Sequence, residues 1–205
     1  MMKLDSDGLP DKLEMAKKRD KKIDITPVAI SKLPHIDYKG LDGKQNQALF
    51  SLAQTVLQIA MTENNSNEVA VTCSLDNENI EDVIGISFGD EHGVDVCSDT
   101  VSYHLIVSST NCAVVVLHNH PSTQTLSMED LMFFLSYPTV RLMIVVTNQG
   151  NIHYVCKDDD FSYENARNLF NETCEELNEK STWKEIYMAG LSFLARCSEV
   201  GLYYR

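Results

Sequence analysis

The sequence lacks several features that define whole classes of proteins. No apolar run approaches the roughly 18 residues of a membrane span, and the N-terminus has no apolar core of the kind found in signal peptides. The six cysteines include no Cys-x-x-Cys pair, and several lie within apolar segments. We therefore expect buried thiols in a reducing compartment. These absences predict a soluble, cytoplasmic protein that has no membrane partner and no disulfide framework.

Positive charge is also scarce. The net charge is −13, and residues 1–22 carry seven Lys/Arg against five Asp/Glu, which leaves ten against twenty-five, or −15, for the rest. The strongly negative remainder of the chain repels phosphate backbones, which argues against direct binding of duplex DNA. The basic cluster Lys17-Lys18-Arg19 with Lys21-Lys22 is compatible with contact to an acidic partner or nucleic acid, or with a solvated tail.

The composition changes along the chain in a way that predicts three parts. Residues 1–42 are polar and interrupted by prolines, so we expect an N-terminal arm that is partly extended. Residues 43–160 alternate between helical and strand patterns and predict one domain. Residues 161–205 have helical spacing and predict a C-terminal helical extension.

The expected order of elements within these parts predicts an α/β fold. The helices are expected over residues 44–61, 99–109, 127–136, 162–179 and 183–201. The strands are expected over residues 68–75, 82–88, 112–117, 140–147 and 152–156. Helices between strands indicate an α/β sandwich, with a mixed β-sheet flanked by helices.

The most informative segment is residues 117–131, which read LHNHPSTQTLSMEDL. His118 and His120 follow a continuous apolar strand, and alternate residues of a strand share a face, so both histidines can point at one ion. Asp130 follows in the first turn of an expected helix and offers an oxygen ligand. Two histidines and one carboxylate leave the fourth tetrahedral position of a zinc ion open for water. The pattern therefore predicts a catalytic zinc site with His118, His120 and Asp130 as ligands.

Hydrolysis by a zinc-bound water also needs a donor for the developing oxyanion. Ser127 can supply that donor through its hydroxyl. The Ser-x-x-Asp pattern is equally typical of a helix N-cap, and both roles are compatible with one side chain.

The general base must come from another part of the chain. Glu68 stands at the start of the first expected strand, where burial of a carboxylate is costly unless it is used. The alternative for Glu68 is an exposed residue at a strand end. Other carboxylates are less suited: those of the turns have less fixed geometry, and that of Glu129 points about 100° away from Asp130 around the helix. The turn carboxylates are Glu78, Glu81 and Glu91.

Together these residues resemble the motif of the JAMM (JAB/MPN) metallopeptidase superfamily, and His-Asn-His-Pro-Ser resembles its RadC-like branch. The resemblance spans about residues 44–157 and implies a JAB/MPN-like, cytidine-deaminase-like fold. It also implies zinc held by His118, His120 and Asp130, with Glu68 as general base and Ser127 assisting the oxyanion. One difference is that Pro121–Leu126 is one residue shorter than the spacing typical of the family.

The resulting hypothesis is a zinc-dependent metallohydrolase that cleaves peptide or isopeptide bonds in a protein or peptide substrate. The alternative is a catalytically inactive RadC-like binding or scaffold protein associated with DNA repair or mobile elements. A zinc deaminase is excluded because the His-x-Glu and Pro-Cys-x-x-Cys elements are absent. The sequence makes no prediction of oligomeric state.

Overall fold

The computed structural model describes residues 21–205. The basic cluster Lys17–Arg19 lies outside this range, whereas Lys22 donates from Nζ to Oδ1 of Asn67 at 2.7 Å. The described residues form two compact units. We call residues 21–125 with 139–154 the sheet unit, and residues 126–138 with 155–205 the helical unit.

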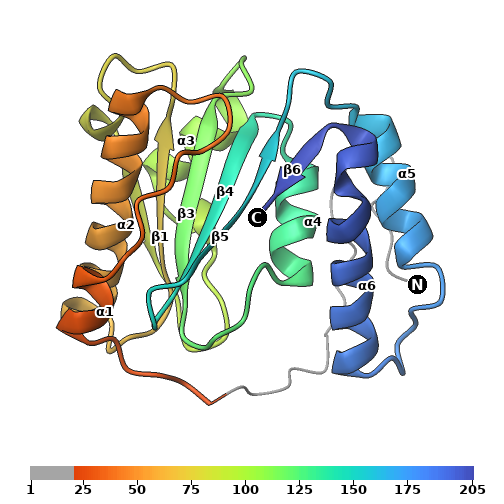
Figure 1. Ribbon diagram of the computed structural model, residues 1–205, viewed down its shortest axis with the longest axis horizontal. Coiled ribbons are helices and arrows are strands. Elements are labelled where there is room, and N and C mark those ends of the chain that lie inside the picture. Colours follow the sequence, from red (N-terminus) through yellow and green to blue (C-terminus); the bar gives the residue numbers. More distant parts are fainter. Residues whose placement is uncertain (1–20) are drawn as a thin grey trace. The chain divides into compact units, whose positions relative to one another are not determined.

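The order of elements along the chain can be followed by colour in Figure 1. The α-helices are α1 (Pro27–Ser31), α2 (Gly43–Glu63), α3 (Thr100–Ser108), α4 (Met128–Ser136), α5 (Tyr163–Thr173) and α6 (Trp183–Arg196). The strands are β1 (Val69–Ser74), β2 (Gly85–Phe88), β3 (Val114–His120), β4 (Val140–Thr147), β5 (Ile152–Lys157) and β6 (Leu202–Tyr204). Short 3-10 turns are η1 (Ile80–Asp82), η2 (Val96–Ser98) and η3 (Cys197–Val200).

The strands form one mixed sheet in the order β2-β1-β3-β4-β5-β6. β1 pairs antiparallel with both β2 and β3, whereas β3 and β4 are parallel. The chain passes from β4 to β5 through a tight turn in which Gly150 has a φ of +88°. A Cβ atom at Gly150 would also lie 2.8 Å from the carbonyl oxygen of Ala29. Both the positive φ and this close approach therefore favour glycine. The α/β class and the mixed sheet expected from the sequence are confirmed.

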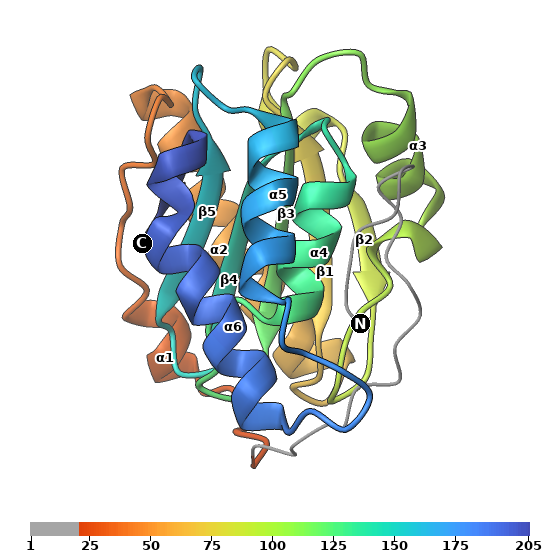
Figure 2. The ribbon, with the colours of Figure 1, turned by 90° about the vertical axis from the view of Figure 1, so that its right-hand side faces the viewer.

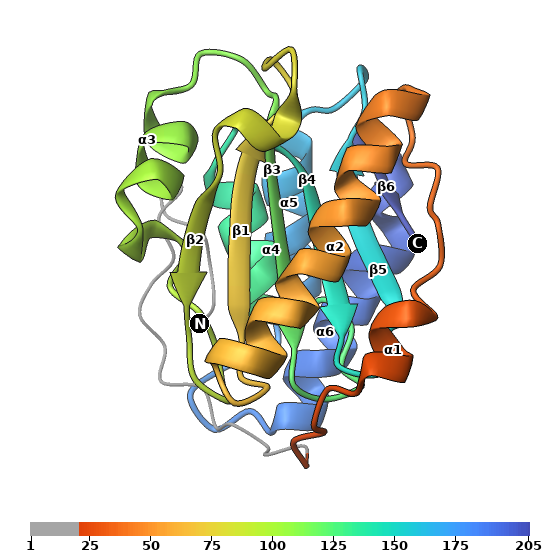
Figure 3. The same ribbon diagram turned by 90° about the vertical axis from the view of Figure 1, so that its left-hand side faces the viewer.

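Helix α2 packs on β1 and β3 in the sheet unit, as Figure 3 shows. The helix begins with a capping box, in which the Asp42 carboxylate accepts from the Gln45 amide while the Gln45 side chain accepts from the Asp42 amide. Its apolar side chains recur at helical spacing and are buried: Leu49, Leu52, Ala53, Val56, Leu57 and Ala60. Within residues 21–205, no helix combines the length and apolarity needed to cross a membrane.

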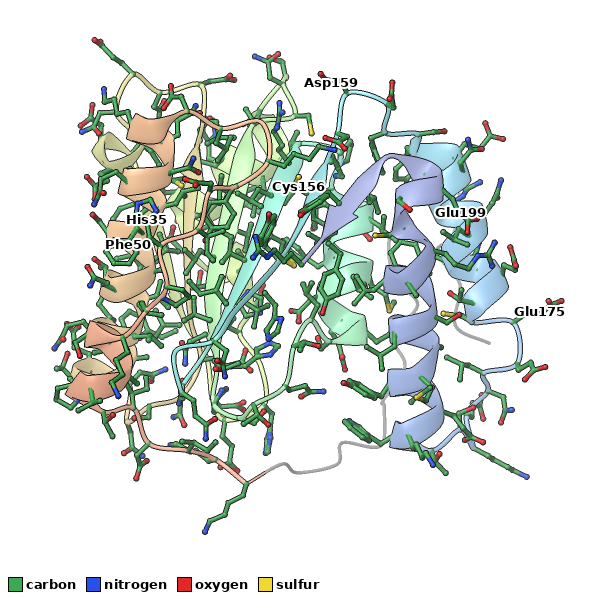
Figure 4. All side chains as sticks on the ribbon, viewed as in Figure 1. His35, Phe50, Cys156, Asp159, Glu175 and Glu199 are labelled. Atoms are coloured by element: carbon green, nitrogen blue, oxygen red, sulfur yellow. The ribbon has the colours of Figure 1, made fainter. Side chains whose placement is uncertain are left out.

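Residues 21–42 contribute to the core of the sheet unit, although the sequence suggests a polar arm. Ile25, Leu33 and Tyr38 are buried. The ring of His35 lies 5.3 Å from that of Phe50 on α2, a contact visible in Figure 4. The apolar residues of this segment are too few to show a helical or strand periodicity. They are still buried, because α2 and the sheet provide an apolar surface for them.

Helices α4, α5 and α6 of the helical unit pack on one another (Figure 2). Two helix ends differ from expectation, since α5 ends at Thr173 and α6 at Arg196. The expectation of helix up to residue 201 is wrong because Gly201, with a φ of +76°, turns the chain into β6. β6 then pairs antiparallel with the end of β5. Three residues are too few to reveal a strand by alternation.

Candidate metal centre

The two histidines lie at the C-terminal end of β3, which extends through His120 rather than ending at Leu117 as expected. All seven residues of the strand are buried. Because His118 and His120 alternate along the strand, their side chains share one face of the sheet. Their Nε2 atoms are 3.1 Å apart, and their ring planes are inclined by 61°. The strand therefore directs two ring nitrogens at one point.

This separation fits a shared metal ion. Two nitrogens that bind one tetrahedral zinc at about 2.0–2.1 Å are about 3.3 Å apart. The other ring nitrogen of His120, Nδ1, is 3.0 Å from the carbonyl oxygen of Gln124, which can only accept a hydrogen bond. A proton on Nδ1 would let the His120 ring donate to this carbonyl and would leave Nε2 available to bind a metal ion. A backbone carbonyl that fixes the tautomer in this way is usual for metal-binding histidines.

Asp130 completes a group of three possible ligands. The ligand atoms of His118, His120 and Asp130 all lie within 4.8 Å of one another. Oδ2 of Asp130 accepts a 2.7 Å hydrogen bond from the backbone amide of Ser127, which restrains the carboxylate. A carboxylate that binds a metal through one oxygen commonly has its other oxygen held by such a bond. These three residues could hold a metal ion.

Ser127 is the N-cap of α4. Its hydroxyl oxygen accepts from the backbone amide of Asp130 at 3.0 Å, which together with the bond from the Ser127 amide forms a capping box. The cap predicted from the sequence is thus confirmed. A serine hydroxyl can accept one hydrogen bond and donate another, so Ser127 can cap the helix and still donate to an oxyanion. Its role in oxyanion binding stays a prediction.

Glu68 is buried just before β1, with only 7% of its surface exposed. Two backbone hydrogen bonds hold it to the segment after β2: the Glu68 amide donates to the Asp90 carbonyl, and the Glu68 carbonyl accepts from the Gly89 amide. Ala70 pairs with His118 in the antiparallel register of β1 and β3. Continued for two more positions, this register would bring Glu68 opposite His120. The other expectation for Glu68, an exposed strand end, does not hold.

Sequence reasoning missed two asparagines next to the site. Asn119 and Asn148 are among the most buried polar residues of the described chain, with 0% and 1% of their surfaces exposed. Asn119 donates from Nδ2 to Oδ1 of Asn148 at 2.8 Å. An asparagine between two histidines of a buried strand was a usable signal, because a buried amide must find hydrogen-bond partners.

His153 on β5 is a third residue that sequence reasoning missed. Its pKa is lowered, first by burial of the half-buried ring and second by the charge of His120. Both effects favour a neutral imidazole at His153. His153 is not one of the three grouped ligands.

A polar cavity of about 320 Å³ lies at the opposite end of the sheet strands from the histidines. It is lined by residues where β1 ends and where β3 and β4 begin, among them Asp76, Asn111 and Arg141. Asn111 donates to Oδ2 of Asp76 at 2.9 Å across this region. None of the expected site residues lines this cavity, so it is separate from the histidine site.

Comparisons of the chain with protein-family models, with characterised proteins and with solved structures find no significant match. The site therefore stands on its residues and their geometry.

Proposed function

We propose that this protein is a zinc-dependent metallohydrolase that cleaves peptide or isopeptide bonds. The observation that carries the proposal is the convergence of His118 Nε2 and His120 Nε2 at 3.1 Å, with Asp130 in the same group of ligand atoms. This set of two imidazoles and one carboxylate suits zinc, and it leaves a coordination position for water. Zinc in such a site lowers the pKa of its bound water to about 7 and polarises the scissile carbonyl.

The residues around the site suit the remaining steps of amide hydrolysis. Glu68, which is buried just before β1, accepts a proton from the attacking water and returns it to the leaving amine. The Ser127 hydroxyl donates to the oxyanion of the tetrahedral intermediate.

The motif supports placing the protein in the JAMM superfamily, in its RadC-like branch, with a JAB/MPN-like fold. The sequence His118-Asn119-His120-Pro121 precedes a helix that begins with the Ser127–Asp130 capping box. The mixed sheet with a central β3 and the position of Glu68 before β1 agree with that proposal.

The test measures metal content and hydrolysis in the same preparations of the full chain. We expect about one zinc per chain by plasma mass spectrometry, and cleavage of a panel of quenched peptides and lysine-isopeptide conjugates that chelation abolishes. His120→Ala should lose both zinc and activity. His104→Ala, at an exposed position of α3, is the matched control and should keep both. A wild-type protein that takes up no zinc at neutral pH would refute the proposal.

The same experiment separates the alternative of an inactive scaffold. The shortened loop before Ser127 is the feature that favours this alternative. Stoichiometric zinc without cleavage of any amide in the panel would support a binding protein built on a metal-stabilised site. In that outcome His120→Ala should lower thermal stability, because the bound ion stabilises the folded state.

A further inference from the structure

The C-terminal end of β3 is held by a network of buried amides on the face opposite the histidines. Oδ1 of Asn119 accepts from the backbone amide of Val69 at 2.8 Å. Nδ2 of Asn119 donates both to the carbonyl of Asn67 at 3.1 Å and to Oδ1 of Asn148 at 2.8 Å. Asn119 thus ties β3 to the segment that enters β1 and to the turn after β4.

Asn148 extends the network to the beginning of the described chain. Its Nδ2 donates to the carbonyl oxygens of Ile23 at 2.7 Å and Ser66 at 2.9 Å. Its backbone amide donates to the carbonyl of His120 at 3.0 Å. Each amide hydrogen of both side chains therefore has an acceptor, and a fully satisfied buried network favours one arrangement of the segments it joins.

The segment Lys22–Ile25 is attached to the loop after the histidines by further bonds. The amide of Ile23 donates to the carbonyl of Pro121 at 2.7 Å. The amide of Ile25 donates to the hydroxyl of Ser66 at 3.0 Å, and Ile25 itself is buried. Residues about a hundred positions apart in the sequence thus brace the residue that directly follows His120.

We propose that Asn119 and Asn148 are positioning residues that couple the docking of Lys22–Ile25 to the geometry of the His118–His120 pair. The inference rests on the proposed metal site. Both asparagines act through the backbone of His120 and not through the metal ion. Detaching Lys22–Ile25 therefore weakens zinc binding although every ligand stays in place, and bound zinc in turn holds the segment more firmly, because coupling between two sites is reciprocal.

The first test uses the wild-type chain. Hydrogen exchange of single amides is followed by NMR with and without Zn²⁺. We expect zinc to slow exchange of the Ile23 and Ile25 amides, and to leave the Tyr38 amide unchanged. Tyr38 is the internal control, because its amide donates to another buried asparagine, Asn46, at 3.1 Å. Equal effects at Ile23 and Tyr38, or no effect at Ile23, would overturn the coupling.

The second test compares Asn148→Ala with Asn46→Ala. Both remove a buried asparagine of the sheet unit that bonds to backbone groups. Zinc affinity is measured by competition with a chromophoric chelator. Asn148→Ala should weaken zinc binding about tenfold or more, in the range found for residues that support metal ligands. Asn46→Ala should lose stability but keep its affinity. Similar affinities in the two variants would overturn the inference.

A third comparison guards against a failure of Asn148→Ala to fold. A chain lacking residues 1–25 is compared with one lacking residues 1–20, so that the difference isolates the docked segment. The shorter chain should bind zinc more weakly. If wild-type protein binds no zinc at all, the proposed function fails, and the asparagine network is judged by exchange alone. Unchanged exchange at Ile23 and Val69 in metal-free Asn148→Ala would then overturn it.

Discussion

The backbone amide of Val69 donates to Oδ1 of Asn119 across 2.8 Å, so the first residue of β1 is bound to the residue between the two histidines. This bond continues the β1–β3 pairing beyond the Ala70–His118 pair by means of a side chain. It holds Glu68 and His120 at the same end of two neighbouring strands. The bond thereby links the expected base to the expected ligands.

The role of Glu68 is tested by Glu68→Gln, which removes the proton acceptor but keeps the shape. We expect zinc to stay bound and turnover to fall by about 10²–10⁴-fold, the usual contribution of a general base. Steady-state hydrolysis and metal content are measured together. Glu63→Gln, at the exposed end of α2, is the control and should change neither. Full activity in Glu68→Gln would assign the base to another residue.

The capping box of α4 is tested by Ser127→Ala. Loss of the cap should lower the free energy of unfolding by about 1 kcal/mol, as for other N-caps. It should also weaken zinc binding, because the lost bond from the Asp130 amide to the Ser127 hydroxyl fixes the backbone of the residue that carries the carboxylate. Ser162→Ala, which removes the N-cap of α5, should destabilise the protein to a similar degree. If both variants bind zinc as tightly as wild type, the cap has no part in orienting Asp130.

The buried Lys157 stabilises the C-terminal end of α4. Its Nζ donates to the carbonyls of Phe134 at 3.2 Å and Tyr137 at 2.8 Å, where a cation also interacts favourably with the helix dipole. Lys157→Met leaves both carbonyls without this donor and should lower the free energy of unfolding by about 1–3 kcal/mol. Urea denaturation followed by circular dichroism measures the change. Lys184→Met on an exposed position of α6 should change stability by less than about 0.5 kcal/mol.

We expect the folded protein to lose stability at alkaline pH because of its buried thiols. Burial raises the pKa of Cys73 to about 12 and that of Cys197 to about 11. The folded state therefore holds these protons more tightly than the unfolded state, in which a thiol has a pKa near 8.5. Their contribution to stability is complete below about pH 8.5 and is lost as the pH rises through the folded values. Unfolding free energies measured between pH 8 and 11 should fall, and Cys73→Ser, which has no thiol to ionise, should flatten the slope.

Alkylation provides an independent check on the same thiols. Cys112 is exposed, whereas Cys73, Cys174 and Cys197 are buried. At pH 8 the folded protein should react with iodoacetamide at Cys112, while these three buried thiols react only after denaturation, because the thiolate is the reactive form. Peptide mass spectrometry identifies the modified residues. Rapid labelling of Cys73 in the folded state would contradict the assigned burial.

Local elements with strong patterns were well predicted from the sequence. β4 has the predicted bounds Val140–Thr147, because a buried apolar strand ends where polar turn residues begin. Ser127 was expected to cap a helix, and it accepts a backbone amide in the structure. Asp99 and Thr182 cap their helices in the same way. Capping and burial of a strand depend on neighbours in sequence, so local chemistry suffices for them.

Elements that depend on distant partners were not predicted. β6 exists as a strand because β5 offers it an unpaired edge, and its three residues have no pattern of their own. The helix α1 and the buried residues Ile25 and Tyr38 likewise depend on surfaces formed elsewhere in the chain. Their stabilisation comes from apolar area buried against partners that no local window contains.

For the candidate metal centre, the sequence by itself determined which residues could hold a metal ion, because His118, His120 and Asp130 follow from residue type and spacing. Tertiary structure alone decided how they are oriented. The pairing of Ala70 with His118 placed the start of β1 beside the histidine end of β3, and the carbonyl oxygen of Gln124 came within 3.0 Å of Nδ1 of His120. The buried amides of Asn119 and Asn148 then joined the segment at Ile23 to the histidine strand. Spacing along one strand restricts which side chains share a face, whereas hydrogen bonds between distant segments form only when the chain folds.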